Sequence, residues 1–121
     1  MVFVVDAHSG GRPSCLRQIE VKAEGASRPR AEAGDDATRV SYGTFWFESV
    51  SYDDHCADRF PLAYGKTLSG AHQQDRGIVK AKALVREVIY EVSSTTGANE
   101  YGSGKFIIRS NGRVENLPPA R

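Results

Sequence analysis

The densest group of reactive side chains in the sequence surrounds His55 and Cys56. A thiolate nucleophile needs a base within hydrogen-bond reach and a further group that orients that base. Neighbouring residues point away from each other on a helix or a strand, so His55 is a poor base for Cys56. His8 or His72 would have to approach from elsewhere in the fold. The weak catalytic candidates are therefore His55, Cys56 and His72, with Asp54 as a further acid or base.

Metal and nucleotide motifs do not fit the sequence. The side chains able to bind a metal ion lack the i, i+4 spacing of a helical site; they are Asp6, His8, Asp54, His55, Cys56 and His72. Gly65-Lys66-Thr67 ends like a phosphate-binding loop, but Phe60 occupies the position of the first glycine of that motif. We therefore expect no metal ion and no cofactor, and no motif is specific enough to identify a family.

Aromatic and arginine side chains provide a non-catalytic alternative. Tyrosine and tryptophan rings line ligand pockets and protein interfaces, and arginine holds anions through paired hydrogen bonds. Tyr101 precedes a glycine in a polar connector, where a role in the core is not expected. The candidate ligand-binding residues are Trp46, Tyr90, Tyr101, Arg109 and Arg113.

Composition limits the class of protein. The chain has 121 residues, the length of one domain, and we expect a single domain over residues 1–121 with a flexible loop around residues 24–37. A formal net charge of +1 gives no support for nucleic-acid binding. We expect no signal peptide, and no apolar run is long enough for a membrane helix, so we expect a cytoplasmic protein without a disulfide.

Residues 75–94 carry the longest regular apolar pattern. Five apolar residues recur there at alternating steps of three and four, which is typical of one face of a helix: Ile78, Ala81, Val85, Val88 and Val92. Charged residues fall largely on the opposite side. The pattern predicts a long amphipathic helix, with Tyr90 off its apolar stripe.

The remaining regular segments are predicted to be extended. Residues 2–5, 16–23 and 39–52 are rich in β-branched and aromatic side chains. Asn111-Gly112 between two extended segments predicts a hairpin with a type I′ turn. The sequence therefore predicts an α+β fold: a mostly antiparallel sheet of about five strands, one long amphipathic helix packed on one face, and a C-terminal β-hairpin.

The function predicted from these features is that of a small non-enzymatic module. It binds a small molecule or a protein and self-associates as a homo-oligomer, through the Trp46 strand or through the region from Tyr101 to Arg113. The alternative is a small enzyme with a pocket between sheet and helix, which uses His55, His72 or Asp54 as acid or base.

Overall fold

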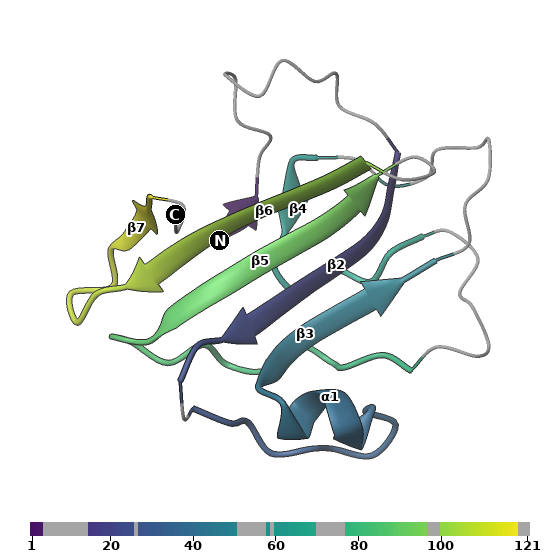
Figure 1. Ribbon diagram of the computed structural model, residues 1–121, viewed down its shortest axis with the longest axis horizontal. Coiled ribbons are helices and arrows are strands. Elements are labelled where there is room, and N and C mark those ends of the chain that lie inside the picture. The colour runs from purple at the N-terminus through teal and green to yellow at the C-terminus, as the bar shows by residue number, and fades with distance from the viewer. Residues whose placement is uncertain are drawn as a thin grey trace.

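The structure is a computed structural model that describes residues 1–3, 15–25, 27–50, 58, 60–69, 77–96 and 100–118. A five-stranded antiparallel sheet forms its body, with the strand order β3-β2-β5-β6-β7 (Figure 1). Its strands are β2 (Leu16–Ala23), β3 (Thr44–Ser49), β5 (Ile89–Thr96), β6 (Glu100–Ile108) and β7 (Val114–Leu117). Two short strands, β1 (Val2–Phe3) and β4 (Leu62–Ala63), pair behind this sheet, and the helix α1 (Ala37–Ser41) lies beside β3.

Strand β2 confirms the prediction for residues 16–23. Ile19, Val21 and Ala23 point to the same face and are at most 5% exposed, whereas Lys22 between them is exposed. Every second residue of a strand points to the same face, so this alternation buries one side of the sheet and leaves the other side polar.

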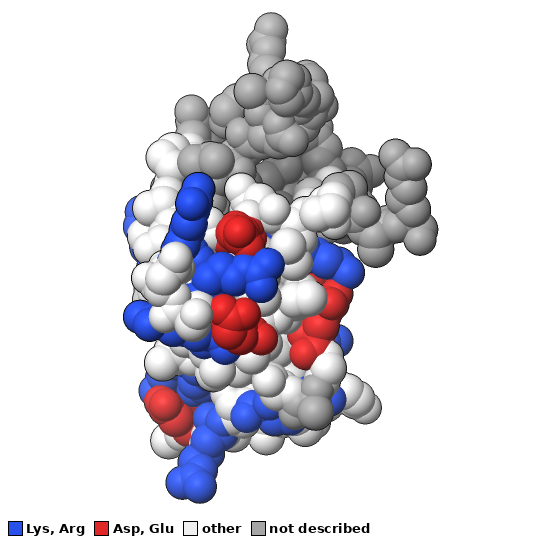
Figure 2. Space-filling view, turned by 90° about the vertical axis from the view of Figure 1, so that its left-hand side faces the viewer, with Lys and Arg blue, Asp and Glu red and all other residues white. Residues whose placement is uncertain are grey.

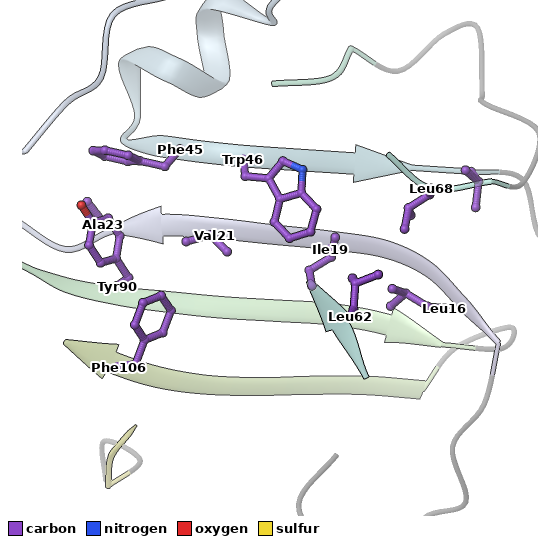
Figure 3. Close-up of a cluster of buried hydrophobic side chains, with 11 residues drawn as sticks. Leu16, Ile19, Val21, Ala23, Phe45, Trp46, Leu62, Leu68, Tyr90 and Phe106 are labelled. Atoms are coloured by element: carbon purple, nitrogen blue, oxygen red, sulfur yellow. The ribbon is translucent and has the colours of Figure 1, made fainter. Parts of the chain in front are cut away.

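The core lies on the face of the main sheet where Phe3 of β1 and Leu62 of β4 pack, and Figure 3 shows its buried side chains. Trp46, which is 1% exposed, stacks on Phe3 and meets the edge of Tyr64. The pairing of β2 with β3 shifts register between Val21 and Lys22, so that Phe45 is an extra residue on β3. Such a bulge can turn two neighbouring side chains toward one face, and both Phe45 and Trp46 belong to the core cluster.

The long helix predicted for residues 75–94 is wrong. The described part of this range, residues 77–94, is extended, and α1 with five residues is the longest helix in the described part of the chain. Val85 on the predicted apolar stripe is 50% exposed, whereas Tyr90, predicted to lie off the stripe, is fully buried. The fold is therefore sheet-rich rather than α+β.

Residues 77–85 run along the outer edge of β3. Val79 exchanges both backbone hydrogen bonds with Phe47, and the N–H of Lys82 donates to the carbonyl of Phe45. Ile78, Val79, Val85 and Val88 are β-branched, which favours an extended backbone. A turn at Arg86 and Glu87, with φ of 62° at Glu87, then leads into β5. The spacing of three and four residues therefore came from two extended pieces joined by a turn.

The C-terminal hairpin forms as β6 and β7, but its turn is not type I′. The N–H of Gly112 donates to the backbone carbonyl of Arg109, and the N–H of Arg109 donates to the backbone carbonyl of Arg113. Gly112 has a φ of 85°, and Asn111 is not among the described residues with positive φ. These bonds match a three-residue loop, in which a type I turn is followed by a residue in the left-handed region.

Two further segments differ from their predictions. Residues 39–41 belong to α1 rather than to a strand, because the Asp36 side chain accepts hydrogen bonds from the N–H groups of Thr38 and Arg39 and caps this helix. Residues 100–104, predicted as a connector, are the first half of β6. Within the predicted loop at residues 24–37, the described residues carry an isolated bridge from Asp35 to Ile78.

Candidate functional site

Trp46 and Tyr90, two of the predicted ligand-binding residues, lie in the core. Trp46 is 1% exposed and Tyr90 is fully buried, with its ring 5.5 Å from that of Phe106. Burial raises the pKa of Tyr90, although the N–H of Val85, which donates to its hydroxyl oxygen, acts in the opposite direction. Their surroundings are those of packing residues.

Arg109 and Arg113 lie at the turn between β6 and β7. The Arg109 guanidinium donates to Glu115 and Glu87, and the hydrogen bond to Glu115 raises the pKa of Arg109. Figure 2 views the molecule from the side on which this hairpin projects in Figure 1, and it shows basic and acidic side chains interspersed. This end of the sheet offers no surface of one sign, and Arg109 is occupied by its own carboxylate partners.

Tyr101 lies at the opposite end of β6 from the two arginines. Eight residues separate Tyr101 from Arg109, which corresponds to about 26 Å along an extended strand. The structure therefore does not bring the tyrosine and the arginines into one site.

Tyr101 belongs to two cross-strand rows on the outer face of the sheet, the face opposite the core. Antiparallel pairing places Gln18, Thr95 and Tyr101 in one row. The next row along the strands contains Glu20, Ser93 and Ser103. These rows line a groove of about 290 Å³. The Tyr101 groove, as we call it, is lined by Gln18, Ser93, Ser94, Thr95, Tyr101, Gly102 and Ser103.

The Tyr101 groove is polar but uncharged. All of its lining side chains carry a hydroxyl or an amide, apart from Gly102, and Tyr101 is 78% exposed. The nearest charge in the two rows belongs to Glu20, whose carboxylate accepts from Arg39 at 3.3 Å and from the Thr44 hydroxyl at 2.7 Å. Glu20 is therefore balanced, and the groove can donate and accept hydrogen bonds without a net charge.

Sequence reasoning identified Tyr101 but missed its companions. Ser93 was assigned to the predicted helix at residues 75–94, and Thr95 lies just beyond its end, so the two were not expected to share a strand face. The signal that identifies them is the pair of alternating patterns Ser93-x-Thr95 and Tyr101-x-Ser103, which share one face once both segments are read as paired strands.

The acid–base candidates cannot be placed in this site. Asp54, His55, Cys56 and His72 lie outside the described residues. Within the described residues no three His, Cys, Asp or Glu side chains gather as a group able to hold a metal ion. Cys15 is disulfide-bonded, so the expectation that the chain has no disulfide is wrong. Sequence reasoning had rejected a disulfide because it assumed a reducing compartment.

Among the described residues, no helix is long and apolar enough to cross a membrane. Comparisons of the chain with family models, with curated proteins and with solved structures found no significant match. The function is therefore argued from the geometry of this chain alone.

Proposed function

We propose that the protein is a non-enzymatic binding module and that the Tyr101 groove holds a neutral, hydroxyl-rich ligand such as a saccharide. The observation that carries this proposal is an exposed aromatic ring beside uncharged hydroxyl and amide groups on the outer face of the sheet. An anionic or cationic ligand would find no opposite charge among the lining residues.

Each part of the groove matches one property of a sugar. The face of a tyrosine ring is electron-rich and attracts the C–H groups on the flat side of a sugar ring. Serine and threonine hydroxyls both donate and accept, as sugar hydroxyls do. The volume of about 290 Å³ lies near the lower end of the range for small-molecule sites, about 300–1,000 Å³, which suits a short saccharide.

Calorimetric titration with neutral hexasaccharides tests the proposal. We expect one of the glucose, xylose or N-acetylglucosamine hexamers to bind, and Tyr101→Ala to abolish that binding. Tyr101→Phe should retain most of the affinity, because the ring face is unchanged. Tyr42→Ala is the matched control, since Tyr42 is 66% exposed and adjoins α1. Equal loss in the Tyr101→Ala and Tyr42→Ala variants, or no binding to any hexamer, would refute the proposal.

Self-association remains part of this proposal, and β7 is its best-supported surface. β7 ends the strand order of the main sheet, whereas the outer edge of β3 is bonded to residues 79–82. An unpaired edge strand can add a strand from a second copy. Asn116→Pro removes a backbone N–H donor from β7 and should lower the oligomer fraction in light scattering. A monomeric wild-type protein would exclude self-association.

Two expectations from the sequence stay predictions. The alternative of a small enzyme that uses His55, His72 or Asp54 stays a prediction. A cytoplasmic location also stays a prediction, but the disulfide at Cys15 favours an oxidising compartment instead.

A further inference from the structure

A second groove lies away from the Tyr101 groove, where the loop at residues 28–32 faces the extended segment at residues 81–85. Its volume is about 330 Å³, and its lining includes Arg28, Arg30, Ala81, Ala83 and Val85. Phe45, which is 3% exposed, also contributes to the lining. We call this the Arg30 groove.

The Arg30 groove keeps a net positive charge, because Arg28, Arg30 and Lys82 outnumber the lining Glu32 and the Asp35 that pairs with Lys82. Lys82 is compensated by Asp35 and lies 3.5 Å from Glu32. Arg28 binds backbone carbonyls, including that of Ser41 at 2.9 Å, and these uncharged acceptors leave its charge available. Arg30 is exposed and has no hydrogen-bond or ion-pair partner within the described part of the chain. A carboxylate is the complement of two such guanidinium groups.

The other wall of the groove is shaped for an extended chain. Exposure alternates along residues 81–85: Ala81, Ala83 and Val85 are exposed, while Lys82 is buried and Leu84 is half-buried. The backbone groups of Ala81 and Ala83 have no hydrogen-bond partner among the described residues. Just before them, the N–H of Asp36 already bonds to the carbonyl of Ile78, so this segment accepts a neighbouring chain where one is present. An extended peptide can pair with such a segment through its main chain.

We propose that the Arg30 groove binds an extended peptide segment of a partner protein, whose backbone pairs along residues 81–85 and whose carboxylate side chains bind Arg28 and Arg30. Short apolar side chains of the same peptide would cover Ala83 and Val85. This site and its ligand are independent of the Tyr101 groove.

The test uses a fluorescein-labelled eight-residue peptide of alternating glutamate and valine, with binding followed by fluorescence anisotropy. We expect Arg30→Glu to weaken binding at least tenfold. Arg113→Glu makes the same charge change at an exposed arginine that does not line the groove, and it should leave affinity within twofold. A peptide with lysine in place of glutamate should not bind, and N-methylation of alternate backbone amides should weaken binding.

Four outcomes would overturn the inference. They are equal binding of the lysine peptide, equal effects of Arg30→Glu and Arg113→Glu, full affinity in both of two peptides that are each N-methylated on one set of alternate amides, and no binding of the glutamate peptide. Circular dichroism of each variant establishes that it is folded. Hexasaccharide binding in Arg30→Glu should equal that of the wild type, which separates this site from the Tyr101 groove.

Discussion

Replacing Asp35 by alanine should destabilise the protein more than other single substitutions on its surface loops. The Asp35 carboxylate accepts from the N–H of Glu32 at 2.7 Å, from the N–H of Lys80 at 2.9 Å and from the Lys82 ammonium. The side chain of Asp35 is fully buried, and that of Lys82 is 7% exposed. Asp35 thereby fixes the loop before α1 to the segment that covers the edge of β3.

The size of the effect follows from what the alanine variant leaves behind. Removing one member of a buried ion pair costs about 3–5 kcal/mol, because the other charge stays buried. Glu32 lies 3.5 Å from the Lys82 ammonium and is 62% exposed, so it retains part of the attraction. We expect a loss of about 3 kcal/mol, at the lower end of that range, which corresponds to a fall in Tm of roughly 10 °C for a chain of this length.

Urea unfolding followed by the fluorescence of Trp46, the only tryptophan, measures this loss. Asp36→Ala is the matched control, since it removes the cap of α1 from the neighbouring position and should cost only about 1 kcal/mol. The Asp35→Leu, Lys82→Met double variant should recover part of the loss, because no buried charge remains. If Asp35→Ala costs no more than Asp36→Ala, the ion pair does not hold this edge and the reasoning fails.

The Asp35 carboxylate also makes the free energy of unfolding depend on pH. Burial by itself would raise the pKa of Asp35, but hydrogen bonds from Lys82, Lys80 and Glu32 outweigh it and lower that pKa. Since the folded pKa lies below the unfolded value of about 3.9, the stabilisation is present above that pH and is lost as the pH falls through the folded value. Between pH 5 and pH 3 the wild type should therefore lose more stability than Asp35→Asn, and parallel curves would contradict this assignment.

Three further substitutions test separate parts of the fold. Tyr64→Phe removes a hydroxyl that donates to the Lys82 carbonyl at 2.8 Å, and it should cost about 1 kcal/mol in urea unfolding. Gly112→Ala should cost about 1–2 kcal/mol because φ is 85° there, and Gly112→Asn should cost less; equal costs would contradict the turn geometry. Reduction should slow wild-type migration in a denaturing gel but not that of Cys15→Ser, and unchanged wild-type mobility would contradict the disulfide.

Strand β2 could be predicted from the sequence because its apolar and polar residues follow a single period. Residues 16–23 alternate between apolar and polar, and no other period competes with this alternation. The hairpin at Asn111-Gly112 could be predicted equally well, because its turn needs positive φ and few residue types adopt it. The type of the turn could not be predicted, because it depends on the register of β6 against β7. Residues far from the turn determine that register.

The segment at residues 77–96 shows why the rest could not be predicted. Its spacing of three and four fits a helix, but Val79, Val88 and Val92 are β-branched and Ser93-Ser94-Thr95-Thr96 lacks good helix formers. Whether the edge of β3 needs a covering chain is a tertiary property that no local pattern contains. Because the companions of Tyr101 come from this same segment, the error in secondary structure also hid the candidate site.

In β2, β5 and β6 the two faces of the sheet separate stability from binding, whereas Phe47 on the outer face of β3 is buried with Val40 and Val79. The core face buries Ile19, Val21 and Tyr90 completely, whereas Ser93 and Ser103 on the outer face fill no space in the core. Substituting these serines should therefore change the free energy of unfolding by less than about 0.5 kcal/mol. A ligand that depends on Ser93 and Ser103 must then lose affinity in variants whose stability is unchanged. Affinity that falls only in destabilised variants would mean that the ligand reports folding and that the groove is not its site.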